Sequence, residues 1–124
     1  NYVVPTGVLD DPLSITFVMG MDRSSQQAMA FTYQNLVHCV SLLPANSSFT
    51  TMAIGQNQLP GTTLSLLFGG NMRVGFEDNV YYRRGELAQN NAQLVERAVS
   101  LAHEFGYEVA TPDEARERLN LKKF

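Results

Sequence analysis

The apolar residues of this chain form short blocks that alternate between two spacings. A run of apolar and β-branched residues over 14–20 follows Pro12 and predicts a strand buried on both faces. Apolar residues then recur at helical spacing over 28–43, and Pro44 ends that pattern. The chain is therefore predicted to open with one strand followed by one helix.

The same unit is then repeated. Residues 48–54 predict a second strand, and residues 59–68 predict a helix that is closed by Gly69 and Gly70. Residues 72–76 predict a third strand, which leads into a polar loop.

The clearest helix follows that loop. Asn90 or Asn91 is placed to cap it, and Gly106 is placed to end it. Its apolar stripe consists of Leu94, Val95, Ala98, Val99, Ala102 and Phe105. A last short helix begins at Thr111-Pro112, with a capping-box glutamate at Glu114.

Three consecutive strand–helix units predict an α/β fold with a parallel sheet and right-handed crossovers. Two architectures fit this order: part of a doubly wound sheet, or part of a (β/α)₈ barrel. The strands contain no Gly-x-Gly-x-x-Gly turn at their ends, which weakens a dinucleotide-binding reading. In either architecture, functional groups gather at the carboxyl ends of the strands. A barrel further predicts that the helices lie on one face of the sheet only.

Composition narrows the class of protein. The chain has 124 residues, 44% of them hydrophobic and 17% charged, with a formal net charge of −3. That length and composition suit one domain-sized core, and the charge gives no reason to expect a nucleic-acid partner or an anionic membrane. No apolar run is long enough to cross a bilayer. A single cysteine, Cys39, and the lack of a signal-peptide pattern favour a cytoplasmic protein.

The charges are unevenly distributed. Residues 1–72 contain only Asp10, Asp11, Asp22 and Arg23 as charged residues. Because a free-standing domain rarely leaves so much surface uncharged, we expect the first part of the chain to be covered by more of its own protein or by another subunit. The sequence therefore predicts a homo-oligomer, a piece of a larger protein, and a chain that is not a stable monomer by itself.

Reactive side chains are densest at the end of the third predicted strand. Strand alternation places Arg73, Gly75 and Glu77 on one face, which points inward in a barrel, and leaves Asp78 at the rim. Buried charges are costly unless they are paired or bind a metal. This pattern therefore indicates either a structural ion pair or a catalytic site.

The string Gly-Gly-Asn-Met-Arg-Val-Gly-Phe-Glu-Asp-Asn over 69–79 carries a family resemblance, together with Tyr82, Gly85 and the Ala-Thr-Pro-Asp-Glu-Ala-Arg string over 110–116. The chain resembles the C-terminal part of the β-keto acid cleavage enzymes, from about residue 13 to its end. The resemblance implies a zinc-dependent (β/α)₈ barrel that condenses a β-keto acid with acetyl-CoA and releases acetoacetate and a new CoA thioester. Residues 1–124 would then be the C-terminal fragment of one TIM-barrel domain, with three βα units and a terminal helix.

The resemblance also implies roles for individual residues. Glu77 matches the zinc-ligand glutamate of the family, Asp78 matches its general base, and Arg73 matches the arginine that assists the base. A metal would polarise the β-keto carbonyl, a carboxylate would move a proton, and a guanidinium would balance the charge of an enolate.

Some features depart from the family pattern or have weaker assignments. The sequence has no His-x-His pair, which supplies the other zinc ligands of the family, and His38 and His103 are predicted to face solvent on their helices. Asn57 and Gln58, at the start of a helix, are candidates for contact with a CoA phosphate. Two alternatives stay open: a catalytically inert fragment that acts only through association, and an unrelated TIM-barrel lyase or aldolase.

Overall fold

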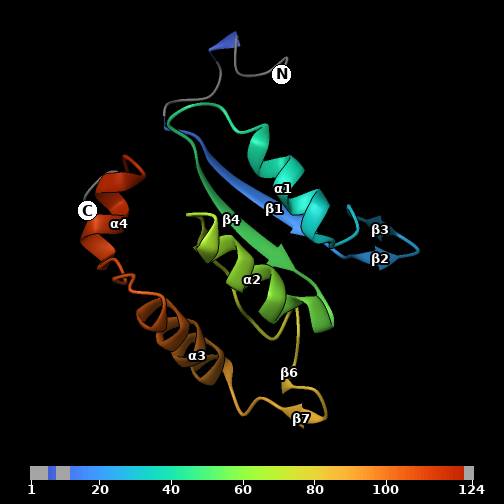
Figure 1. Ribbon diagram of the computed structural model, residues 1–124. Helices are drawn as coiled ribbons and strands as arrows, with labels where there is room; N and C mark the ends of the chain where they lie inside the picture. The colour runs from blue at the N-terminus through green and yellow to red at the C-terminus, as the bar shows by residue number, and fades with distance from the viewer. Residues whose placement is uncertain (1–5, 8–11, 122–124) are drawn as a thin grey trace.

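The fold is built on a three-stranded parallel sheet. The structure, a computed structural model, describes residues 6–7 and 12–121. The strands are β1 (Ser14–Met19), β4 (Ser48–Ala53) and β5 (Asn71–Met72), and they lie in the order β1-β4-β5 (Figure 1). The prediction of parallel β–α–β units is therefore confirmed, because both strand pairs are parallel.

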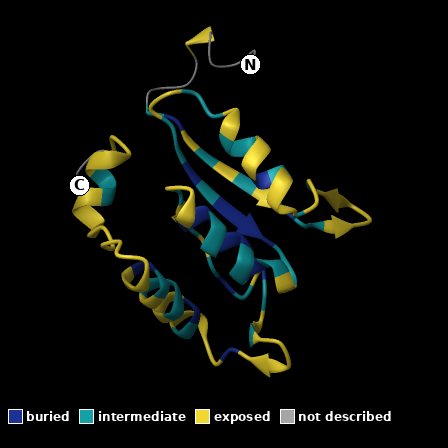
Figure 2. Cartoon of the chain, viewed as in Figure 1, coloured by how far each residue is buried: buried dark blue, intermediate teal, exposed yellow. Residues whose placement is uncertain are grey.

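β4 is the central strand and the buried one (Figure 2). Its Phe49, Thr51 and Ala53 side chains share one face of the sheet and are buried. The Thr51 N–H donates to the Ser65 hydroxyl at 3.1 Å, and that hydroxyl donates to the Asn71 carbonyl at 2.7 Å. A helix side chain thus ties β4 to β5 on this face.

Two helices cover the same face of the sheet. They are α1 (Tyr33–Ser41) and α2 (Gln58–Leu67), the latter preceded by the 3₁₀ turn η2 (Gly55–Asn57), and both lie on one side of the strands in Figure 1. Because the strand order never reverses, right-handed crossovers put both helices there. α2 packs so closely that a Cβ on Gly61 would lie 2.6 Å from the Ala53 Cβ.

The first predicted helix begins later than the periodicity indicated. The prediction of 28–43 is wrong at its start, because α1 begins at Tyr33, where the Thr32 hydroxyl accepts the Asn35 N–H. The residues before it form a small antiparallel hairpin, β2 (Asp22–Arg23) and β3 (Gln26–Gln27). A parallel bridge between Met19 and Met29 then extends the edge of β1. Tertiary pairing therefore overrides the helical spacing of the residues before Tyr33.

The third predicted strand is shorter than the sequence indicated. β5 ends at Met72, so the prediction of a strand over 72–76 is wrong, and residues 76–78 form a turn. A second unpredicted hairpin follows, β6 (Tyr81–Arg83) and β7 (Glu86–Leu87). The guanidinium of Arg97 lies 4.5 Å above the centre of the Tyr82 ring, which joins the hairpin to the next helix.

The last two helices confirm the capping signals of the sequence. α3 (Asn91–Glu104) is capped by Asn90, which accepts the Gln93 N–H, and α4 (Pro112–Arg118) has a complete capping box between Thr111 and Glu114. α4 buries none of its residues and stands apart from the sheet in Figures 1 and 2.

The described residues thus contain βα units and a terminal helix, as predicted. No helix among residues 6–7 and 12–121 is long and apolar enough to cross a membrane. The predicted domain span of 1–124 includes residues outside the described ranges, and barrel closure and self-association stay predictions.

Candidate functional site

The carboxyl ends of the three parallel strands meet at one edge of the sheet. The Ile54 N–H, just after β4, donates to the Met19 carbonyl at 3.1 Å. The next residue, Gly55, donates its N–H to the Asp78 carbonyl at 2.7 Å. Gly55 has a φ of +63°, a conformation that side-chain-bearing residues rarely adopt. This edge therefore brings the end of β4 against the residues that follow β5.

The predicted site residues do come together there, but in an arrangement that differs from the prediction. Arg73 forms an ion pair with Glu77, and its Nε lies 3.6 Å from Asp78 Oδ2. The Glu77 side chain is 67% exposed, whereas that of Asp78 is only 4% exposed. β5 ends at Met72, so the strand alternation from which the inward face of Glu77 was predicted does not extend to residue 77. The direction of Glu77 relative to a barrel interior stays a prediction, and the structure shows Asp78 as the buried carboxylate of the two.

Asp78 is a buried carboxyl group with unused acceptor capacity. Its Oδ2 accepts no hydrogen bond from any described residue. Burial raises the pKa of Asp78 above its ordinary value of 3.8, and the charge of Arg73 lowers it by less. A carboxyl group that is desolvated, lacks a hydrogen bond at one oxygen and lies next to a guanidinium has the features of a proton-transfer group.

The turn over 75–79 is anchored by residues that the sequence analysis did not assign to it. Gln58 is completely buried, and its Nε2 donates to the Gly75 carbonyl at 3.0 Å. The Phe76 N–H donates to Asn91 Oδ1 at 2.9 Å, at the start of α3. A signal for the first contact was present, because Gln58, Thr62 and Ser65 recur at helical spacing and mark a polar stripe on the helix.

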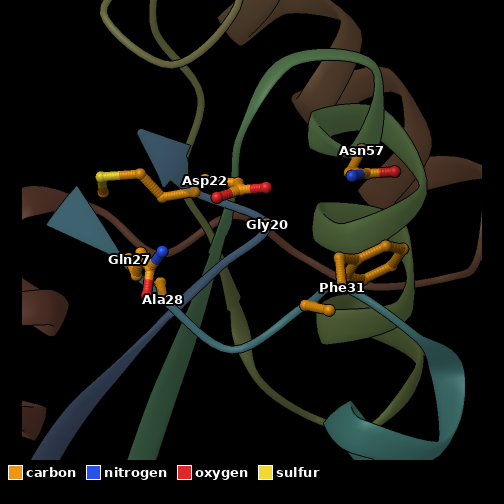
Figure 3. A pocket seen from close by; sticks show the side chains of 8 residues that line it. Gly20, Asp22, Gln27, Ala28, Phe31 and Asn57 are labelled. Carbon is orange, nitrogen blue, oxygen red and sulfur yellow. The ribbon is translucent and has the colours of Figure 1, made fainter. Parts of the chain in front are cut away.

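A cavity of about 460 Å³ lies at the end of β1 (Figure 3). It is lined by residues of the β1 end, the first hairpin, the segment before α1, and η2: Gly20, Met21, Asp22, Gln27, Ala28, Ala30, Phe31 and Asn57. Figure 3 shows the Asp22 carboxylate pointing toward Asn57. None of Arg73, Glu77 and Asp78 lines this cavity.

This geometry separates the two candidates for contact with CoA. Asn57 lines the cavity, whereas Gln58 is buried and already donates to Gly75. Asp22 brings a carboxylate to the same lining as Asn57, and like charges repel, so the lining disfavours a phosphate. The contact of Asn57 and Gln58 with a CoA phosphate stays a prediction, and Gln58 would have to leave Gly75 to make it.

The described residues do not by themselves fit a zinc ion. No group of three or more histidine, cysteine, aspartate or glutamate side chains that could hold a metal occurs within residues 6–7 and 12–121. His38 and His103 are exposed on α1 and α3, as predicted. Glu77 would supply one carboxylate ligand, and tight zinc sites use several protein ligands.

A parallel sheet that gathers an arginine and two carboxylates at its carboxyl edge defines the chain as an α/β protein with a strand-end site. The sequence profile of one family, described as beta-keto acid cleavage enzyme, matches residues 1–121. The chain belongs to this family. The family match also removes the alternative of an unrelated barrel lyase or aldolase.

Several relatives carry names that describe cleavage or transfer. The chain is 44% identical over 117 residues to a 3-keto-5-aminohexanoate cleavage enzyme of Acetoanaerobium sticklandii. This match covers 94% of the chain and 41% of that relative. It is 38% identical to a 3-dehydrocarnitine:acetyl-CoA trimethylamine transferase of Rhizobium meliloti, over 94% of the chain and 37% of that relative. A 3-oxoadipate:acetyl-CoA acetyltransferase of Cupriavidus necator is 37% identical, over 93% of the chain and 40% of that relative. The chain spans about two fifths of the length of these relatives.

Proposed function

We propose that the protein containing this chain is a β-keto acid cleavage enzyme that condenses a β-keto acid with acetyl-CoA and releases acetoacetate and a new CoA thioester. Membership of the family and the acetyl-CoA named in two of the relatives support this proposal. We further propose that the three βα units are part of a (β/α)₈ barrel. The parallel order β1-β4-β5, with both crossover helices on one face, supports that architecture.

One observation carries the proposal: a buried aspartate lies next to an arginine at the carboxyl end of a parallel strand. Asp78 is 4% exposed and its Oδ2 lies 3.6 Å from Arg73 Nε. The pair stands where barrels and open α/β sheets place their reacting groups. Asp78 and Arg73 are also the residues for which the family resemblance implies the roles of general base and assisting arginine.

In this proposal Asp78 accepts and returns a proton, and Arg73 stabilises negative charge. Asp78 takes a proton from the carbon next to the keto group of the substrate, so an enolate develops while the carboxyl becomes neutral. The guanidinium of Arg73 favours the ionised form of Asp78 before this step and balances the negative charge of the enolate during it. The proton held on Asp78 is then available to be returned when acetoacetate forms.

Glu77 is our candidate for a zinc ligand. A zinc ion would polarise the keto carbonyl of the substrate. Within the described residues Glu77 belongs to no group of three or more possible metal ligands, so further ligands are needed. We therefore expect the 124-residue chain alone to be catalytically inert.

The cavity beside η2 is our candidate for a contact with acetyl-CoA. Asn57 can donate and accept hydrogen bonds, as can the amide groups of the pantetheine arm of CoA. The Asp22 carboxylate in the same lining favours those neutral groups over a phosphate.

The proposal is tested by acetyl-CoA-dependent release of acetoacetate from β-keto acids by the complete protein that contains this chain. Asp78→Asn is expected to lower turnover by about 10²- to 10⁴-fold, because the amide cannot take the proton. Asp113→Asn is the matched control, since Asp113 is an exposed aspartate of α4 paired with Arg116. An Asp78→Asn variant with normal turnover would refute the assignment of the base, and an inactive wild-type protein would refute the proposed function.

A further inference from the structure

The turn that carries Glu77 and Asp78 is held in place from the β4–α2 junction. β5 ends at Met72, so no ladder of the sheet fixes the residues that follow it. Hydrogen bonds from other elements do so instead: one to Asn91 of α3, and two from the β4–α2 junction. The Gly55 N–H donates to the Asp78 carbonyl at 2.7 Å, and Gln58 Nε2 donates to the Gly75 carbonyl at 3.0 Å.

The Gly75 carbonyl is the centre of this arrangement. Besides Gln58 Nε2, it accepts the Asp78 N–H at 3.2 Å and the Asn79 N–H at 3.1 Å. The Gly75 oxygen thus accepts the two backbone N–H groups that close the turn. Among the described residues, Gln58 is the one side chain that donates to it. Loss of that donor would leave a buried carbonyl to be shared by the two turn amides alone.

Burial of the Gln58 side chain costs free energy, and its hydrogen bond to Gly75 gives the reason for a glutamine at this position. The side chain is completely buried, and its Oε1 has no partner among the described residues. An amide with an unpaired oxygen costs free energy in the interior, where an apolar side chain of the same length would cost none. The hydrogen bond to Gly75 is the one specific interaction that the glutamine adds and an apolar residue would not.

We propose that Gln58 is a positioning residue for the reaction, which sets Asp78 against Arg73 through the Gly75 carbonyl. The proposal rests on the proposed function. Gln58 does not touch the reacting atoms, and its effect passes through the backbone of the turn. A small misplacement of a reacting group is enough to matter, because displacements near 1 Å lower rates by about 10²-fold.

The test compares Gln58→Met with Gln56→Met in the complete protein. Gln56 is the matched control, because it is a glutamine of the same junction whose side chain is exposed. Gln58→Met is expected to lower kcat by about 10- to 100-fold with KM nearly unchanged, and to speed amide hydrogen exchange at Asp78 and Asn79. Gln56→Met is expected to change neither.

Three results would overturn the proposal. They are an unchanged kcat, a rise in KM alone, and a lowered kcat without faster exchange in the turn. A rise in KM alone would make Gln58 a ligand contact. If wild-type protein shows no cleavage activity, the proposed function fails separately, and exchange at Asp78 and Asn79 still decides whether Gln58 holds the turn.

Gln58→Glu covers the case in which Gln58→Met does not fold. The glutamate keeps the size of the side chain and can donate to Gly75 only while its carboxyl is protonated. Turnover and slow exchange, each relative to wild type at the same pH, are therefore expected to recover as the pH falls. A ratio that stays constant with pH would also overturn the proposal.

Discussion

Two segments of the molecule use their polar side chains in opposite ways. In the segment from β4 to the turn after β5, side chains bond to backbone groups that are distant in the sequence. The separations are 14 residues from Thr51 to Ser65, 17 from Gln58 to Gly75, and 22 from Phe49 to Asn71. These bonds are buried or half-buried and join a helix, two strands and a turn.

Most side-chain hydrogen bonds of residues 90–118 instead stay within single helix turns, apart from those that Asn91 and Arg97 make to residues before α3. Three of the local bonds join residues three apart: Asn90 with Gln93, Thr111 with Glu114, and Asp113 with Arg116. All of these bonds are exposed. Long-range hydrogen bonds therefore dominate among the polar contacts of the first segment, and local ones among those of the second.

The comparison shows where single substitutions should act widely and where they should stay local. A change in the first segment disturbs groups from several elements at once, including the candidate site. A change in the capping residues is expected to loosen one helix only.

The largest expected effect in the first segment is at Glu77. In the complete protein, Glu77→Gln is expected to lose zinc and activity together, because a neutral amide replaces a carboxylate ligand. Elemental analysis for zinc alongside acetoacetate release measures both. Glu86→Gln is the control, since Glu86 is an exposed glutamate paired with Arg83. Full zinc content and activity in Glu77→Gln would reduce Arg73 and Glu77 to a structural ion pair.

A smaller effect, on stability, is expected at Gly61. An alanine inside a helix is ordinarily better than glycine by about 1 kcal/mol. At Gly61, however, the new Cβ would meet the Ala53 Cβ at 2.6 Å and the Phe31 ring at 3.2 Å. Overpacking of this kind costs about 1–3 kcal/mol, so we expect Gly61→Ala to lower the free energy of unfolding.

The matched change in the second segment is Gly106→Ala. Gly106 has a φ of +78° and no atoms near an added Cβ, so its cost is local backbone strain. Denaturant unfolding measures the stability that each variant loses, and amide protection shows where it is lost. Gly61→Ala should weaken β4–α2 packing, whereas Gly106→Ala should weaken only the end of α3. Equal protection of β4 amides in the two variants would break the contrast.

The smallest effect is expected at Thr111. Thr111→Ala removes the capping box, and because α4 buries no residue, only α4 should fray. Carbon chemical shifts of α4 measure this, with midpoints of global unfolding expected to stay the same. A lowered global midpoint would show that α4 supports the rest of the fold.

The same helix should respond to pH. Hydrogen bonds from the Thr111 backbone and hydroxyl lower the pKa of Glu114 below its ordinary value of 4.5. A carboxyl whose folded-state pKa is lowered stabilises the helix above its ordinary pKa and loses that contribution as the pH falls through the folded value. In wild type, α4 should therefore fray in acid. Thr111→Ala keeps the backbone N–H that donates to Glu114 and loses only the hydroxyl, so its acid transition should be smaller.

The difference between the segments also explains what the sequence could predict. Asn90, Gly106 and Thr111 act on neighbours within a few residues, so their roles were read correctly. The strand–helix order and the parallel pairing also followed from local patterns. The grouping of Arg73, Glu77 and Asp78 was predicted as well, because the three lie within six positions.

Features that depend on distant residues were not predicted. The burial of Asp78 and exposure of Glu77 follow from a turn that Gln58 and Gly55 hold from another element. The start of the predicted helix, residues 28–32, is not helical because Met29 pairs with Met19 of β1. In both places a long-range contact outweighs the local pattern.

The parallel pairing of β1 with β4 has a consequence for how the chain folds while it is being synthesised. Leu13 and Ser48, hydrogen-bonded between the two strands, are 35 residues apart. At usual ribosomal speeds of about 5–20 residues per second, β1 is made roughly two to seven seconds before its partner exists. A hairpin such as β2–β3 closes within about 10 μs. In the growing chain, the edge of β1 that later pairs with β4 therefore stays unpaired for this time, while the neighbouring β2–β3 hairpin has already formed.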